Sequence, residues 1–174
     1  MSDSASARSE MPRDISGADS LVIVSADSPD QIAQVRELFL EYANSLSFNL
    51  CFQSFDQELA ELPGDYAPPE GRLLLAYYEG KLAGCVALHK SDAAACEMKR
   101  LYLRSAFRGK GLGRALVERL IAEARKIGYR CMRLDTVEAD MRDAVALYRK
   151  MGFKDIAPYR ANPMPSARYM ELEL

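Results

Sequence analysis

A short loop with glycines at alternate positions constrains this chain more than any other stretch of its sequence. Residues 108–113 read Arg-Gly-Lys-Gly-Leu-Gly and lie between a strand pattern over 94–104 and a helical pattern over 112–127. Such a loop presents unpaired backbone N–H groups at a helix N-terminus, where the helix dipole also favours an anion. Glycine lets the backbone approach a ligand closely. The sequence therefore predicts a pyrophosphate-binding site in this loop.

Basic residues gather around the loop, although the chain as a whole has a net charge of -2. Proteins that bind nucleic acid in general show a basic excess, so the total charge argues against that class. We therefore expect a small anionic ligand near the loop and no nucleic-acid partner. The clustered basic residues are Lys99, Arg100, Arg104, Arg108, Lys110 and Arg114.

Three phosphate-loop patterns compete for this stretch. In a Walker A loop, Lys and then Ser or Thr follow the last glycine, whereas here Arg114 and Ala115 follow it. A dinucleotide-binding fingerprint requires a glycine at the position of Arg114. The third pattern, Arg-x-x-Gly-x-Gly, is matched in full by Arg108, Gly111 and Gly113. On this loop alone, a plain glycine-rich turn into a helix stays an alternative.

Hydrophobic periodicity predicts a mixed α/β fold with the element order β-α-α-β-β-β-α-β-α-β-β. The glycine inside the third strand, Gly84, indicates a bulge or a close backbone approach. The last strand alternates and is expected to close the sheet at an edge. The predicted strands cover 21–24, 72–79, 81–89, 94–104, 130–136, 153–157 and 169–174, and the predicted helices cover 30–46, a shorter stretch that ends at 62, 112–127 and 141–151.

The N-terminal segment differs in composition from the rest. Residues 1–19 are rich in Ser, Ala and Asp and are predicted to form a disordered tail, while residues 20–174 are predicted to form a single domain. No apolar run precedes Leu21, so no signal peptide is expected, and no stretch of about 18 apolar residues occurs, so no membrane span is expected. The cytoplasm is the expected location. Four scattered cysteines and one histidine offer no ligand cluster, so no metal is expected.

The Arg-x-x-Gly-x-Gly loop resembles the acetyl-CoA loop of the GCN5-related N-acetyltransferases (GNAT), and two further stretches of the chain also resemble that family. Residues 97–103, Glu-Met-Lys-Arg-Leu-Tyr-Leu, are similar to the fourth strand of that family. Residues 144–153 are similar to its second motif, a helix with Leu-Tyr followed by Gly-Phe. The resemblance extends from 21 to 174 and is strongest over 96–153. It implies a mostly antiparallel central sheet flanked by helices, with acetyl-CoA as co-substrate.

The resemblance also implies roles for particular residues. Tyr148 stands at the position of the family's tyrosine acid, and Glu97 at that of a catalytic base. Each has a structural alternative: Tyr148 as a core tyrosine, and Glu97 as a partner of Lys99 or Arg130. The strand 97–103 would splay from its neighbour and hold pantetheine. The cofactor-binding residues implied are Leu101, Tyr102, Leu103, Arg108, Gly109, Lys110, Gly111, Leu112, Gly113 and Arg114. One departure is Met141, which stands where the family often has an Asn that contacts the cofactor.

The acceptor is less constrained than the cofactor. The expected function is direct transfer of acetyl from acetyl-CoA to a primary amine of a small molecule or amino-acid-like acceptor. A non-catalytic acyl-CoA sensor and an enzyme that acetylates a protein or peptide amine remain alternatives. A monomer and a homodimer are both compatible with the sequence. The predicted acceptor-binding residues are Phe52, Phe55, Tyr159 and Arg160, and a solvent-facing loop arginine is the alternative for the last of them.

Overall fold

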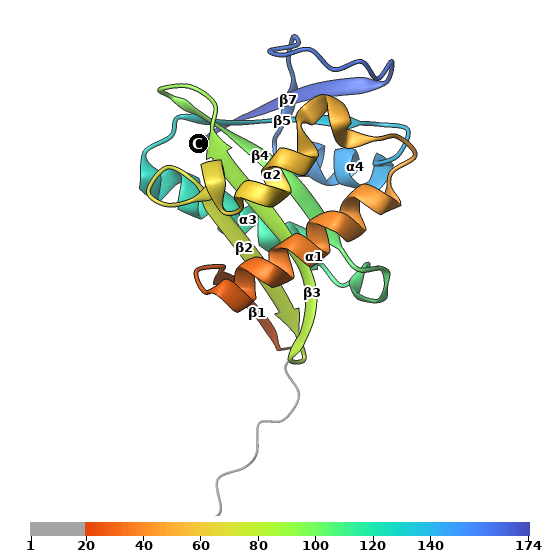
Figure 1. Cartoon of the computed structure of the whole chain (residues 1–174). Coiled ribbons are helices and arrows are strands. Elements are labelled where there is room, and N and C mark those ends of the chain that lie inside the picture. Colours follow the sequence, from red (N-terminus) through yellow and green to blue (C-terminus); the bar gives the residue numbers. More distant parts are fainter. Residues whose placement is uncertain (1–19) are drawn as a thin grey trace, which may run out of the picture.

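The structure is a computed structural model, and it describes residues 20–174 together with all their side chains except that of Phe52. The predicted tail over 1–19 lies outside these residues. The described residues form a seven-stranded sheet with the order β1-β2-β3-β4-β5-β7-β6 (Figure 1). The strands are β1 (Leu21–Ser25), β2 (Arg72–Tyr78), β3 (Lys81–Lys90), β4 (Ala95–Leu103), β5 (Cys131–Val137), β6 (Lys154–Asp155) and β7 (Ala167–Glu173). The α-helices are α1 (Pro29–Ser45), α2 (Phe55–Glu61), α3 (Leu112–Ile127) and α4 (Arg142–Lys150), with short 3-10 turns η1 (Leu50–Gln53), η2 (Gly64–Tyr66) and η3 (Ser105–Phe107).

The sheet is antiparallel except between β4 and β5, which confirms the predicted fold class. The prediction for the last strand was wrong. β7 does not close the sheet at an edge, because it lies between β5 and the short β6. It pairs with β5 over its whole length, and both Tyr169 and Met170 are buried, as expected of a strand covered on its two faces. Only two residues of the predicted strand 153–157 form β6.

Helices cover both faces of the sheet (Figure 1). On one face α1 and α2 pack on alternate residues of β2 and β3, such as Leu73 and Leu75. On the other face α3 and α4 pack on the residues between them, such as Leu74 and Ala76. This period of two is what a strand buried on both faces imposes, because successive side chains point to opposite sides. The sheet thus separates two apolar cores.

The flanking helices begin and end at residues that satisfy their free backbone groups. Ser28 caps α1 by accepting from the backbone N–H of Gln31, and the Gln31 side chain accepts from the backbone N–H of Ser28. This reciprocal capping box is worth about 1 kcal/mol. Gly128 ends α3 in the left-handed conformation at φ 105, which L-residues with a Cβ avoid. The predicted helices 30–46 and 112–127 are confirmed by these boundaries.

A bulge in β4 decides which side chains face α1 and α2. The pairing advances from Ala87 to Cys85 on β3 while it advances from Lys99 to Tyr102 on β4, so β4 carries one extra residue. At the bulge Arg100 adopts a φ of 59. Two successive side chains, Lys99 and Arg100, therefore turn to the same face. Bulges of this kind re-aim side chains next to functional sites.

Gly84 lies opposite the bulged strand, in a close approach as the sequence predicted. A Cβ at this position would lie 2.3 Å from the carbonyl oxygen of Tyr102 and 2.6 Å from the side chain of Leu103. These distances are shorter than any real contact, so a larger residue would push β3 and β4 apart. Gly84 thereby holds residues 102 and 103 close to β3.

Candidate active site

The parallel strands β4 and β5 separate halfway along their length. They pair only where Ala95–Glu97 meets Cys131–Arg133, although both strands continue beyond that point. The gap that opens between them is lined from both faces of the sheet and encloses about 40 Å³. Its walls include Leu101, Leu134, Thr136 and Tyr148. The splay implied by the resemblance is therefore present, and β4 exposes an unpaired edge there.

The glycine-rich loop follows β4 directly and leads into α3. Gly109 and Gly111 have φ values of 75 and 78, in the left-handed region, and Lys110 lies between them. A Cβ on either glycine would meet nothing within 4 Å, so the loop is open to solvent. Gly111 is the N-cap of α3 and makes no side-chain cap hydrogen bond. Backbone N–H groups in such a turn form an anion-binding concavity at a positive helix end.

The other predicted loop residues contribute in different ways. Leu112 is buried against the β2–β3 hairpin, so only its backbone faces the loop. Gly113 packs 3.5 Å from Leu103 and 3.8 Å from Leu147, measured from an ideal Cβ, and thus ties α3 to β4 and α4. Leu112 and Gly113 therefore set the geometry of the loop through their packing.

The basic side chains of the loop surround it without being directed at one point. Arg108 Nε donates to the carbonyl of Leu103 at 3.0 Å, and its guanidinium lies over the Tyr102 ring. Lys110 Nζ lies 5.5 Å from the centroid of Tyr78. Arg114 makes an exposed ion pair along α3 at 2.7 Å, which offsets part of its charge.

Tyr148 reaches the gap from α4, on the α3–α4 face of the sheet. It is 5% exposed and packs against Phe153. Burial raises the pKa of Tyr148, with a smaller contribution from Tyr42. Burial likewise raises the pKa of Tyr42 to about 12. Both phenols therefore stay protonated at neutral pH.

A polar cavity of about 300 Å³ adjoins the gap on the α1–α2 face. Lys99 and Arg100 line both the cavity and the gap, so these two spaces meet at the bulge of β4. Gln53 also lines both, from η1. The residues lining the cavity are Gln53, Ser54, Gln57, Glu58, Glu61, Pro63, Gly64, Asp65, Tyr66, His89, Lys99, Arg100 and Arg160.

Arg100 is fixed in the wall of this cavity. It is 5% exposed, and its guanidinium donates to both carboxylate oxygens of Glu58 at 2.7 to 3.3 Å and to Gln53 Oε1 at 2.9 Å. The Tyr66 hydroxyl donates to the same Glu58 carboxylate. A bidentate buried pair of this kind fixes geometry strongly. The network secures α2 and η1 against the bulge of β4.

Glu97 lies beneath the cavity and not on its wall. Its carboxylate contacts three side chains that do line the cavity: His89 at 3.8 Å, Lys99 at 3.6 Å and Arg160 at 3.0 Å. No described residue donates a hydrogen bond to its Oε1 atom. Burial lowers the pKa of His89, so His89 is mainly neutral at pH 7. The predicted pairing of Glu97 with Lys99 is therefore observed, and both Lys99 and Arg160 lie within ion-pair distance of the Oε1 atom.

The structure brings Arg160 to this cluster from the β6–β7 connection. Arg160 pairs with Asp135 of β5 as well as with Glu97. Tyr159 makes an edge-to-face contact with the Tyr169 ring, and its hydroxyl is buried without a hydrogen-bond partner among the described residues. Burial raises the pKa of Tyr159. Arg160 is thus no free solvent-facing arginine, and its charge is shared by two carboxylates.

Two predicted acceptor residues are placed differently. Phe55 is 7% exposed and lies in the α1–α2 core beneath the Arg100 guanidinium, 5.3 Å from it, away from the cavity surface. Phe52 belongs to η1, but its side chain lies outside the described part of the structure. Met141 lines the gap, and its sulfur accepts from Thr136 Oγ1 at 3.2 Å. Sequence reasoning assigned no acceptor-binding role to Lys99 and no site role to Asp135.

Lys99 is the least compensated charge in this cluster. Burial lowers its pKa from 10.5 to about 8, so the folded state pays to keep it charged. Lys99→Met should therefore stabilise the protein at pH 7, by up to about 3 kcal/mol, since one pKa unit is about 1.4 kcal/mol. Between pH 8 and 10.5 the unfolded chain binds the extra proton, so the wild type gains stability with rising pH and the advantage of Lys99→Met shrinks. Urea unfolding at pH 7 and pH 10 measures this, and destabilisation at pH 7 would contradict it.

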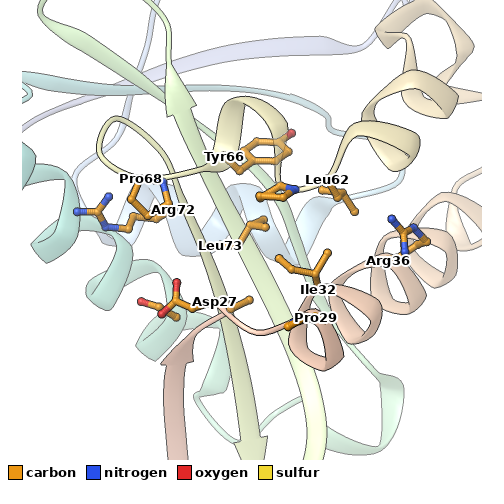
Figure 2. Close-up of a pocket in the computed structure, with 12 residues that line it drawn as sticks. Asp27, Pro29, Ile32, Arg36, Leu62, Tyr66, Pro68, Arg72 and Leu73 are labelled. Carbon is orange, nitrogen blue, oxygen red and sulfur yellow. The ribbon is translucent and has the colours of Figure 1, made fainter.

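A larger hollow of about 470 Å³ lies elsewhere, between the start of α1, the start of β2 and the α2–β2 connection (Figure 2). Its floor is apolar, with Ile32 and Leu73, and Tyr66 separates it from the polar cavity. Its two arginines are engaged: Arg36 donates to a backbone carbonyl of α2, and Arg72 pairs with a carboxylate of α3. None of the residues that line this hollow also lines the gap between β4 and β5, so we assign the hollow no role.

Residues 20–174 hold no cluster of His, Cys, Asp and Glu able to bind a metal ion. In the same residues no helix is long and apolar enough to cross a membrane.

Comparison with known proteins agrees with the geometry. The model of the Acetyltransferase (GNAT) family matches residues 32–153. An uncharacterized N-acetyltransferase of Schizosaccharomyces pombe is 42% identical over 84% of this chain and 90% of its own length. The IAA acetyltransferase of Azospirillum brasilense is 31% identical over 88% of this chain and 98% of its own. A GNAT family acetyltransferase from Elizabethkingia anophelis, solved with acetyl-CoA bound, superposes with a TM-score of 0.62 at 21% identity, over 90% of this chain and all of that one (100%).

The chain belongs to the GNAT family and is an acetyl-CoA-dependent N-acetyltransferase. The resemblance carried by residues 97–113 and 144–153 is thereby confirmed at the level of the family.

Proposed function

We propose that this enzyme transfers the acetyl group of acetyl-CoA to the primary amine of a small, amino-acid-like molecule. The observation that carries this proposal is the meeting of gap and cavity at the bulge of β4. A thioester in the gap is reached by Tyr148 from one face of the sheet and by an acceptor in the cavity from the other. A charged, partly open cavity of about 300 Å³ has room for a small polar molecule.

The loop and β4 supply the cofactor site in this proposal. Backbone N–H groups of residues 109–113 bind the pyrophosphate, and the side chains of Arg108 and Lys110 add positive charge. Pantetheine extends along the free edge of β4 at Leu101, Tyr102 and Leu103, as an added strand does. This edge is free because β5 has already separated from β4.

The chemistry divides between the two faces. The amine nitrogen attacks the thioester carbonyl carbon, the C–S bond breaks, and the thiolate of CoA leaves. Tyr148 donates its hydroxyl hydrogen bond to the leaving sulfur, where the negative charge develops. Glu97 accepts the proton of the amine by way of water in the cavity, since His89, Lys99 and Arg160 cover its carboxylate.

A single-turnover experiment tests the proposal. The protein, in excess, is mixed with acetyl-CoA labelled in the acetyl group and with a panel of small amines, and the label is located after separation. Label in an N-acetylated amine is the expected result. Label that stays on CoA indicates a cofactor sensor, and label on the protein or on an added peptide indicates a protein acetyltransferase; either outcome contradicts the proposal.

A further inference from the structure

The three buried or half-buried cations at the cavity differ in how their charge is neutralised. Arg100 has both oxygens of Glu58, and Arg160 has Asp135 and Glu97. Lys99 has no comparable carboxylate partner among the described residues. Its Nζ donates to the neutral amide oxygen of Gln53 at 3.1 Å and lies 3.6 Å from Glu97, and these are its polar contacts in the described part of the chain.

The side chain of Lys99 is nevertheless largely out of water. Its side chain is 9% exposed. A charge out of water needs a counter-charge and hydrogen bonds to be retained at low cost. The ammonium has three N–H donors, and Gln53 accepts from one of them. Lys99 lines both the cavity and the gap, so a ligand in either space lies beside it.

The place of Lys99 fixes which part of an acceptor it touches. An acceptor whose amine reaches a thioester in the gap must pass the bulge of β4, so Lys99 lies beside the atoms next to that amine. An apolar carbon at this position leaves the lysine charge unpaired, and an ammonium repels it. A carboxylate there pairs with it through a charge-assisted hydrogen bond.

We infer that the acceptor is an α-amino acid whose carboxylate is bound by Lys99. In an α-amino acid the nitrogen and the carboxylate are attached to one carbon, which matches a cation placed at the mouth of the reaction gap. The side chain of the amino acid then extends into the cavity of about 300 Å³. Arg160, which the sequence predicted to bind the acceptor, is instead paired with Asp135 and Glu97. The inference rests on the proposed function and narrows its acceptor to one class.

The test compares each L-amino acid with its α-carboxamide and with the amine that lacks the carboxyl group. Thiol release and product mass give kcat and KM for the purified full chain with saturating acetyl-CoA. The free acids should exceed the amides and the simple amines in kcat/KM by about a hundredfold for at least one side chain, because the amide cannot pair with the ammonium.

Variants assign that preference to Lys99. Lys99→Met should raise the KM of the acid at least about tenfold and leave the amide almost unchanged. Lys99→Arg should retain most of the preference, since it keeps the charge. Lys90→Met, in the exposed pair with Glu70, is the matched control and should have no effect. A thermal unfolding curve for each variant separates misfolding from loss of binding.

The results that would overturn the inference differ from those that would overturn the function on which it rests. Carboxyl-free amines as the best substrates would overturn the inference and leave the proposed function standing. An equal effect of Lys99→Met on acid and amide would also overturn the inference. A Lys99→Arg variant that loses kcat at unchanged KM would overturn it too, because that result would make Lys99 a proton acceptor. No N-acetyl product from any acid, amide or amine would overturn both.

Discussion

Tyr148→Phe should lower kcat at least about a hundredfold while the KM for acetyl-CoA changes little. The hydroxyl of Tyr148 is the donor that α4 places at the gap, and removal of a donor to developing charge costs two to four powers of ten in rate. Because the interaction strengthens only as the C–S bond breaks, kcat and kcat/KM should fall equally. Steady-state thiol release with a saturating acceptor measures both constants.

The control is a second tyrosine of the same core. Tyr129 is 8% exposed, and its hydroxyl donates to the Glu70 carbonyl, outside the gap. Tyr129→Phe removes an equivalent hydroxyl and should leave kcat within about twofold, although it costs about 1 kcal/mol of stability. A Tyr148→Phe enzyme as active as the Tyr129→Phe enzyme would mean that Tyr148 only packs against the sheet.

Gly111→Asp should weaken acetyl-CoA binding at least about a hundredfold without unfolding the protein. The φ of 78 at Gly111 is a conformation that Asp tolerates better than most residues, and its Cβ would meet nothing within 4 Å. The new carboxylate lies at the helix end that we assign to the pyrophosphate. Two unit charges about 4 Å apart near a protein surface repel by about 4 kcal/mol, which exceeds the 2.7 kcal/mol of a hundredfold loss.

Gly80 provides the matched control for this prediction. It has a φ of 75 in the β2–β3 turn, and a Cβ there also meets nothing within 4 Å. Gly80→Asp therefore introduces the same charge and the same backbone cost away from the loop. Calorimetric titration should give a wild-type affinity for Gly80→Asp, and equal affinities for the two variants would show that residues 109–113 do not bind the phosphates.

Much of the fold follows from local sequence. The helix α1 is marked by Pro29 and by the apolar spacing that follows it, and the β2–β3 hairpin by Gly80. These signals depend on neighbours in the chain. The place of β7 does not, because its insertion between β5 and β6 depends on pairing with strands that are distant from it in the chain. A pairing of this kind is set by tertiary packing, so alternation over 169–174 alone predicted an edge.

The cofactor loop was more predictable than the acceptor cavity for the same reason. Residues 108–113 are contiguous, whereas the cavity assembles η1, α2, β4 and the β6–β7 connection. In a regular strand Lys99 and Arg100 would face opposite sides of the sheet. The bulge turns both to one side, and nothing in the order of residues 97–103 marks it. Lys99 was therefore missed as an acceptor-binding residue, and Phe55 was placed in the cavity when it packs beneath Arg100.

Amide hydrogen exchange with and without acetyl-CoA tests most directly that loop and gap form one cofactor site. Acetyl-CoA should slow exchange in residues 101–103 of β4 and in residues 109–113 of the loop together, since one molecule contacts both. ATP, which carries phosphates and no pantetheine, should leave residues 101–103 unchanged. Protection confined to the loop, or equal protection of both segments by ATP, would contradict a thioester held in the gap beside Tyr148.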